Sequence, residues 1–195
     1  MKSCVITSVR LDYNSLDDDS FEILTKAFAS LPSLKRLSLA FCDLKACCGY
    51  LLSDMMKSSR CKLLELNLEG NWLGDDGVSV LSEGLPKSGS IETLNISNNR
   101  FQELETTKKL ALACRATSTM KTLDIEGNTI NEIGGRLILS LLQELPRLNV
   151  NVCTTISNDL FRQIMEASKF NRTSRPKVSP VVITRTRRLL ISFIF

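Results

Sequence analysis

The side chains in this sequence that could carry out chemistry are thiols and carboxylates, because the chain contains no histidine. The missing imidazole excludes Ser/His/Asp and Cys/His catalytic arrangements, and it excludes zinc sites of the Cys2His2 type. The seven cysteines are scattered and form no CxxC pairs. This pattern is typical of free thiols that act as small apolar residues in a reducing compartment. The adjacent Cys47 and Cys48 are the one candidate for a redox-active pair. We expect no basic side chain to lower the pKa of either thiol, so the sequence does not favour this activity.

Two short runs of carboxylates, Asp17-Asp18-Asp19 and Asp75-Asp76, each precede a stretch with apolar residues at helical spacing. Acidic side chains in that position cap helices and interact favourably with the positive end of the helix dipole. We expect no other ligands to converge on them, so they do not predict a metal site. The sequence also lacks a phosphate-binding loop and a nucleophile elbow. It therefore predicts a protein that is not an enzyme and that uses neither a metal nor a cofactor.

The elements that would position these side chains follow from an apolar pattern. The stretch 63–73, LLELNLEGNWL, places Leu63, Leu66, Leu68, Asn71 and Leu73 in the spacing L-x-x-L-x-L-x-x-N-x-L. Its middle is a short strand in which Leu66 and Leu68 point to one face and Asn67 points to the other. Asn71 is expected in a buried turn, where its amide can serve backbone groups of its own coil and of the neighbouring coil.

Further copies of this unit begin at residues 6, 34, 91 and 120, and a weaker copy without the asparagine begins at 148. Together with the copy at 63, the starts are separated by 28, 29, 28, 29 and 28 residues. In the second copy, Cys42 stands in place of the asparagine. One such unit cannot bury its own leucines, so the copies are expected to stack and share a continuous core.

The alternation of 28 and 29 residues, the cysteine at position 42 and the segment 71–85, NWLGDDGVSVLSEGL, resemble leucine-rich repeats of the ribonuclease-inhibitor type. The resemblance extends from Ile6 to Val152. It implies an α/β fold, a curved leucine-rich-repeat solenoid or horseshoe segment, with parallel inner strands and outer helices. Because strands stack about 4.8 Å apart and helices need about 8–10 Å, the sheet is expected to form the concave wall.

The concave wall is the surface on which we expect a partner to bind. Its central and carboxyl-terminal coils carry mainly acids and amides, while aromatic and basic residues lie toward the amino-terminal coils. The predicted partner-binding residues are Tyr13, Arg36, Phe41, Glu65, Asn67, Glu69, Glu92, Asn95, Asp124 and Glu126. Such a wall suits a polar or basic protein segment that aromatic contacts anchor at one side. Nucleic acid is a poor fit, because phosphates need a positive surface.

The chain is predicted to divide into a leucine-rich-repeat domain, 1–170, and a basic tail with an apolar end, 171–195. The domain would comprise about five full repeats, a degenerate sixth strand and a capping helix from Leu160 to Lys169. The tail carries a charge of +6 against +4 for the whole chain, which leaves −2 on the repeats. Its end, LLISFIF, is an alternative terminus that folds poorly, a strand that docks on this domain or on a partner, or an anchor at a membrane surface. The first repeat begins close to Met1 without a polar capping unit. Either the chain is a fragment or isoform of a longer repeat protein, which we favour, or a partner covers Val5, Val9 and Leu11.

These features predict a protein–protein interaction module or scaffold that binds its partner on the concave face. The alternative on the same fold is a regulator of a GTPase or of actin filament ends, because Ran GTPase-activating proteins and tropomodulin-like actin caps resemble it. The amino terminus lacks an apolar signal region, and no run of about 18 apolar residues occurs. We therefore expect no transmembrane helix and an intracellular location, cytoplasmic or nuclear. The oligomeric state stays open.

Overall fold

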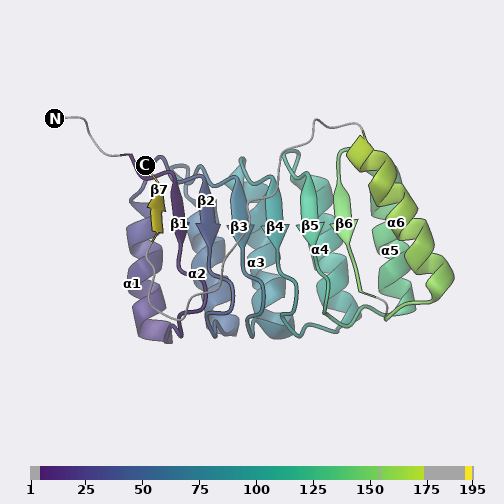
Figure 1. Ribbon diagram of the computed structural model, residues 1–195, viewed down its shortest axis with the longest axis horizontal. Helices are drawn as coiled ribbons and strands as arrows, with labels where there is room; N and C mark the ends of the chain where they lie inside the picture. Colours follow the sequence, from purple (N-terminus) through teal and green to yellow (C-terminus); the bar gives the residue numbers. More distant parts are fainter. Residues whose placement is uncertain (1–4, 154, 174–191, 195) are drawn as a thin grey trace.

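The computed structural model describes residues 5–153, 155–173 and 192–194. In these ranges, short strands and helices alternate along the chain (Figure 1). The strands are β1 (Ser8–Arg10), β2 (Arg36–Ser38), β3 (Glu65–Asn67), β4 (Thr93–Asn95), β5 (Thr122–Asp124), β6 (Asn149–Asn151) and β7 (Ser192–Ile194). The helices are α1 (Asp18–Ala29), α2 (Ala46–Lys57), α3 (Gly74–Ser88), α4 (Leu104–Ala116), α5 (Glu132–Glu144) and α6 (Asn158–Thr173).

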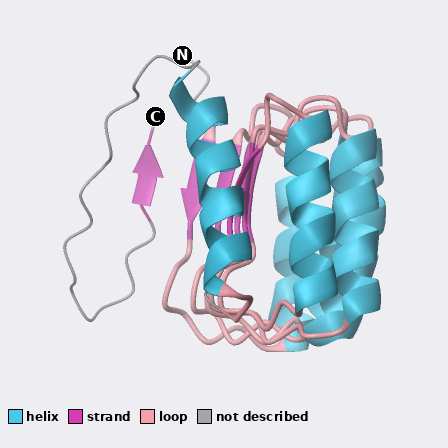
Figure 2. Ribbon diagram, turned by 90° about the vertical axis from the view of Figure 1, so that its right-hand side faces the viewer, coloured by secondary structure: helices cyan, strands magenta, loops and turns pink. Residues whose placement is uncertain are grey.

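The six repeat strands, β1 to β6, are parallel, and neighbours in sequence are neighbours in space. With β7 at the β1 edge they form one seven-stranded sheet in the order β6-β5-β4-β3-β2-β1-β7. The register joins equivalent repeat positions, so Leu66 pairs with Leu37 on one side and with Leu94 on the other. Figure 2, which views the molecule from its β6 end, shows the helix layer beside the strands. This arrangement confirms the predicted curved α/β solenoid with inner parallel strands and outer helices.

The core lies between the sheet and the helices, and one row of strand side chains forms its centre. Val9, Leu37, Leu66, Leu94, Leu123 and Val150 occupy the middle positions of the six repeat strands, and all are buried. Phe21 and Phe101 are the largest fully buried side chains. In β1 to β5 the buried middle residue lies between two less buried neighbours, as the two-residue period of a strand predicts, whereas in β6 the polar Asn149 is buried as well.

Buried asparagines connect successive coils, as the repeat pattern predicts. The Asn71 side-chain Oδ1 accepts hydrogen bonds from the backbone N–H groups of Cys42 and Leu44, each at 3.0 Å. Its Nδ2 donates to the carbonyl oxygens of Leu39 at 2.9 Å and Leu68 at 2.8 Å. Asn71 thus satisfies polar backbone groups that water cannot reach.

Cys42 takes the same place in the second coil with a smaller set of contacts. Its Sγ donates to the carbonyl oxygen of Leu11 at 3.1 Å. Burial raises the pKa of the Cys42 thiol to about 11, so the group stays protonated at neutral pH. The backbone N–H groups of Asn14 and Tyr13 face the sulfur and lower the pKa of the thiol, so Cys42, like the asparagine, lies between backbone donors and acceptors.

Acidic residues hold the helix starts, and some of them act across the repeat boundary. The Asp17 carboxylate accepts a hydrogen bond of 2.7 Å from the backbone N–H of Ser20, which lowers the pKa of Asp17. Asp75 lies in the first turn of α3, yet its Oδ1 accepts from the backbone N–H of Glu103 at 2.9 Å, immediately before α4. Each carboxylate therefore satisfies backbone donors that a helix start leaves unpaired.

The two ends of the sheet are covered differently. At β6, the Ser168 hydroxyl of α6 donates to the Val150 carbonyl at 2.9 Å and accepts from the Val150 N–H at 3.3 Å. Figure 2 shows α6 lying across this end. At the other end, β7 pairs antiparallel with β1, with Phe193 opposite Val9. This pairing corresponds to the strand-docking alternative for the apolar end of the tail, while residues 174–191 and 195 lie outside the described residues.

Within the described ranges, none of the helices combines the length and the apolar content that crossing a bilayer requires.

Candidate partner-binding face

The predicted partner-binding residues lie on the strands and on the segments that flank them, and the structure separates them into three groups. Asn67, Glu69, Asn95, Asp124 and Glu126 lie at or just beyond the ends of β3, β4 and β5, and we call these five residues the acidic cluster. Tyr13 and Phe41 lie in the connections that follow β1 and β2, and we call them the aromatic pair. The third group, Arg36, Glu65 and Glu92, lies at or before the strand starts.

Hydrogen bonds within coils and between neighbouring coils position members of the acidic cluster. Asn95 Nδ2 donates to Glu69 Oε2 at 3.5 Å, and Asn67 Oδ1 accepts from the Glu69 backbone N–H at 3.1 Å. Asp124 Oδ2 accepts from Asn151 Nδ2 at 2.7 Å. The sequence prediction did not include Asn151, which belongs to the degenerate sixth repeat. The strand register gives Asn151 the same position as Asp124.

Glu69 is the electrostatic centre of the acidic cluster. Partial burial raises the pKa of the Glu69 carboxyl, and the negative charges of Asp124, Asp12 and Glu126 raise it further, while the hydrogen bond from Asn95 lowers it. The direction of this shift means that the surroundings disfavour the ionised form of Glu69. A positive group brought to this surface would relieve that repulsion.

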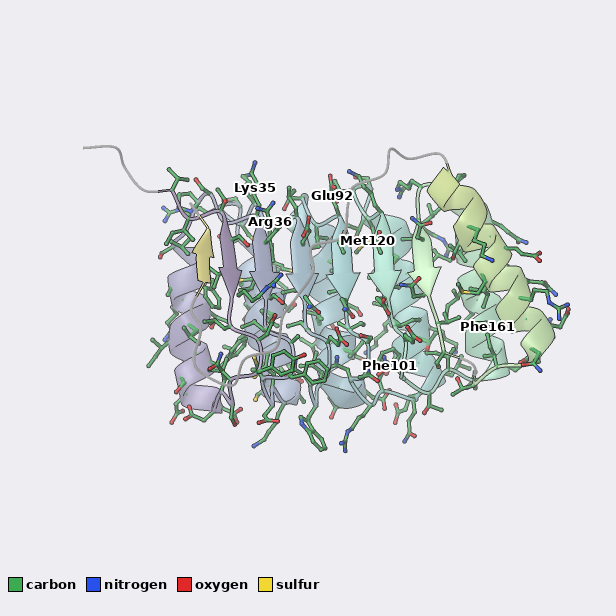
Figure 3. All side chains as sticks on the ribbon, in the orientation of Figure 1. Lys35, Arg36, Glu92, Phe101, Met120 and Phe161 are labelled. Carbon is green, nitrogen blue, oxygen red and sulfur yellow. The ribbon has the colours of Figure 1, made fainter. Side chains whose placement is uncertain are left out.

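The third group has a different electrostatic character. Glu92 Oε2 forms an ion pair of 2.6 Å with Lys121 Nζ. Figure 3 places Lys35, Arg36 and Glu92 toward the edge of the sheet where the strands begin. Charges of both signs therefore lie at this edge, and carboxylates are concentrated at the other edge, around Glu69.

The aromatic pair has an unusual backbone conformation. The rings of Tyr13 and Phe41 stack in parallel with centroids 5.0 Å apart, and the residues are 66% and 40% exposed. Their φ angles are 62° and 55°, in the left-handed region. The equivalent positions in the next three repeats are Gly70, Asn98 and Gly127, also with positive φ. Glycine and asparagine adopt this conformation readily, whereas a bulky side chain does so at a cost of about 1–2 kcal/mol.

Glycine at position 70 extends the platform that the aromatic pair forms. A Cβ atom built on Gly70 would fall 2.3 Å from the Phe41 ring, so any other residue would displace that ring. The ring of Phe41 therefore lies between Tyr13 on one side and the Gly70 backbone on the other. The platform spans three coils.

A second aromatic contact on this side of the molecule was missed from the sequence. The Arg100 guanidinium carbon lies 3.2 Å from the centroid of the Trp72 ring, a cation–π contact, and Trp72 is 45% exposed. Both residues follow the repeat asparagine directly, at a position outside the strand rows on which the prediction was built. Equivalent spacing from Asn71 and Asn99 is the sequence signal that identifies them as neighbours.

The thiols of Cys47 and Cys48 are not activated, as the sequence predicts, but a carboxylate lies closer to them than the sequence predicts. Burial raises the pKa of the Cys48 thiol to about 12, and burial together with Asp18 raises the pKa of Cys47. Neither thiol is therefore an activated nucleophile. The expectation that no ligand converges on the first carboxylate run was wrong, because the ligand atoms of Asp18, Cys47 and Cys48 all lie within 4.8 Å of one another.

Comparisons with known proteins agree with this architecture. A family model described as a leucine-rich repeat matches residues 60–82. NACHT, LRR and PYD domains-containing protein 13 of Homo sapiens is 32% identical over 172 residues, which are 84% of this chain and 16% of that protein. The ribonuclease inhibitor of Sus scrofa is 34% identical over 137 residues, which are 68% of this chain and 29% of the inhibitor. The chain thus spans less than a third of either relative.

Two solved structures share the fold at low sequence identity. The tropomodulin C-terminal domain of Caenorhabditis elegans has a TM-score of 0.58 and 15% identity, covering 88% of this chain and 87% of that one. A structure titled Leiomodin-1 Actin-Binding Site 2 has a TM-score of 0.52 and 12% identity, covering 86% of this chain and 82% of that one. Sequence relatives, the repeat period and the alternating parallel strands and outer helices all agree, and the chain is a leucine-rich-repeat protein of the ribonuclease-inhibitor type.

Proposed function

We propose that the protein is an interaction module that binds a polar or basic protein segment on the concave face, between the acidic cluster and the aromatic pair. The observation that carries this proposal is the aromatic pair. Stacking of two rings contributes about 0.5–1.5 kcal/mol, which is similar to the cost of one left-handed bulky residue and less than the cost of two. Stability alone therefore gives no reason to keep Tyr13 and Phe41 exposed in this conformation.

A role in binding accounts for both residues. Exposed aromatic side chains are enriched at the centres of protein interfaces, where they contribute a large contact area with few rotatable bonds. The stacked rings already have their bound geometry, so few side chains would lose conformational freedom on binding. The repulsion around Glu69 supports a basic partner, because a cationic side chain would stabilise the ionised carboxylates.

Charge reversal on the concave face tests the electrostatic part of the proposal. Partners captured from cell extract by the full chain are identified, and the affinity of each is measured for the wild type and two variants. In the concave variant, Glu65, Glu69, Asp124 and Glu126 become lysine. In the control variant, the exposed helix residues Asp54, Glu83, Glu105 and Glu166 become lysine.

We expect the concave variant to lose affinity by about tenfold or more, and the loss to shrink at high salt. The control variant has the same net charge and should retain wild-type affinity. Circular dichroism verifies that both variants fold. Equal affinities for the two variants would contradict a basic partner on this face.

Changing Tyr13 and Phe41 to asparagine tests the aromatic part. Asparagine occupies the equivalent position in the fourth repeat with a φ of 54°, so it fits the backbone. We expect the free energy of unfolding of the double variant to lie within about 1 kcal/mol of the wild-type value, because relief of backbone strain offsets the lost stacking. Its affinity for the captured partner should fall by about tenfold or more. Unchanged binding, or lost stability without lost binding, would assign the rings a purely structural role.

A second candidate function is regulation of actin filament ends. It is supported by the likeness of fold to the tropomodulin domain and to the structure titled as an actin-binding site of leiomodin-1. At 15% and 12% identity this likeness concerns the fold, so actin binding is a separate hypothesis. Elongation of filaments from their pointed ends, with and without the full chain, tests it. A GTP-hydrolysis assay with candidate GTPases tests the remaining alternative.

We place the protein inside the cell as part of this proposal. The six cysteines in the described part of the chain, at 42, 47, 48, 61, 114 and 153, are all free thiols. Free thiols in this number suit a reducing compartment such as the cytoplasm or the nucleus.

A further inference from the structure

The first turns of α1 and α2 bring together three side chains that the proposed function does not use. Asp18 begins α1, and Cys47 and Cys48 lie in the first turn of α2. The two Sγ atoms are 4.0 Å apart, and a carboxylate oxygen of Asp18 lies within 4.8 Å of both. Sequence separation conceals this cluster, because its members come from two different repeats.

We propose that Asp18, Cys47 and Cys48 form a binding site for a thiophilic metal cation of the Zn²⁺ class. Two sulfur ligands of a tetrahedral zinc ion, each at about 2.3 Å, are separated from each other by roughly 3.8 Å. The 4.0 Å between the two Sγ atoms is therefore already close to the spacing that the ion requires. Asp18 completes a set of three protein ligands and leaves a fourth position for water or for another ligand.

The chemistry of the ligands selects the class of cation. Sulfur favours Zn²⁺, Cd²⁺ and Cu⁺, whereas Mg²⁺ and Ca²⁺ require six or more oxygen ligands. On binding, the two thiol protons are released to solvent, and two metal–sulfur bonds and one metal–oxygen bond form. A disulfide is a different state of the same pair, and its bond of about 2.05 Å would require the sulfur atoms to approach each other from 4.0 Å.

Access to Cys47 also fits a metal site. Cys47 is exposed, so a cation can reach its sulfur from solvent, while Cys48 is fully buried. An open surface hollow beside Cys47 is lined by Asp18, Asp19, Glu22, Cys47, Tyr50 and Leu51, and it gives a cation a path to the site. A bound ion would connect α1 to α2 and so brace the two connections that carry Tyr13 and Phe41.

The test uses the full chain, reduced and freed of metal, with Cd²⁺ as the spectroscopic probe. We expect one equivalent of Cd²⁺ to produce the ultraviolet charge-transfer band of a cadmium thiolate, Zn²⁺ to displace it, and Mg²⁺ to leave it unchanged. Either bound ion should raise the unfolding temperature.

Variants separate this site from the other thiols of the chain. Cys47→Ser should weaken binding by at least about tenfold and reduce the band, and Asp18→Asn should weaken binding while the band persists. Cys61→Ser, which alters a half-buried thiol outside the cluster, is the matched control and should bind like the wild type. Both test positions are exposed, so the variants are expected to fold. Unchanged Cd²⁺ binding in Cys47→Ser, or an equal loss in Cys61→Ser, would overturn the proposal.

Discussion

Replacing Leu66 with alanine is expected to lower the free energy of unfolding by about 2–5 kcal/mol, which is the usual cost of a cavity in a core. Leu66 is 1% exposed and lies in register between Leu37 and Leu94. Its loss therefore leaves space between the sheet and the helices that neighbouring leucines cannot fill without moving the strands. Urea unfolding followed by circular dichroism measures the change through the midpoint and the slope.

Glu69→Ala is the matched control for this variant. Glu69 lies three residues further along the same coil, on the concave side, and its ionised form is disfavoured by its surroundings. Removing the carboxylate should change the unfolding free energy by less than about 0.5 kcal/mol. If the two variants were destabilised equally, the assignment of inward and outward positions on β3 would be incorrect.

Asn71→Ala is expected to have the second large effect, a loss of about 3–5 kcal/mol in the free energy of unfolding. This change removes the acceptor for the backbone N–H groups of Cys42 and Leu44 and the donor to the Leu39 carbonyl, while the Leu68 carbonyl keeps the hydrogen bond from Asn99 Nδ2 at 2.8 Å. Leaving a buried polar group unpaired costs about 1–3 kcal/mol each, and partial relaxation of the turn reduces the total. Urea unfolding measures this variant under the same conditions as the leucine variant.

The chain itself supplies a graded control for Asn71. Asn71→Cys copies the second coil, in which the Cys42 thiol donates to the Leu11 carbonyl and faces the backbone N–H of Asn14. We expect the cysteine variant to lose roughly half as much unfolding free energy as the alanine variant, because a thiol is a weaker donor and acceptor than an amide. A cysteine variant as unstable as the alanine variant would show that the thiol replaces none of the amide's contacts at this position.

The features that the sequence predicted correctly are those that repeat. Leu66, Leu94 and Leu123 are equivalent positions of one pattern, so the two-residue period of a strand is sufficient to send all three into the core. The role of Asn71 follows in the same way, since a buried turn needs a side chain that both donates and accepts. The cap at Asp17 is equally local, because the bond it accepts spans only three residues.

The acidic cluster was predicted as a set of outward positions, and the structure adds how its members interact. The register places Glu69, Asn95 and Asp124 on adjacent coils, which the repeat length alone implies. The direction of the Glu69 pKa shift depends on partial burial and on which neighbouring side chains face it. The ion pair of Glu92 with Lys121 likewise depends on the side-chain conformations of two different coils.

What the sequence by itself determined is the repeat: its length, its inward leucines, its buried asparagines and hence the solenoid with a polar concave wall. Only the tertiary structure decided which residues of neighbouring repeats meet. Asp75 reaches the start of α4, the Phe41 ring covers Gly70, and Asp18 lies beside Cys47 and Cys48. Hydrophobic periodicity is a local property and can be read along the chain. These contacts instead join residues about one repeat apart, and they form because stacking brings successive strands to a distance of about 5 Å.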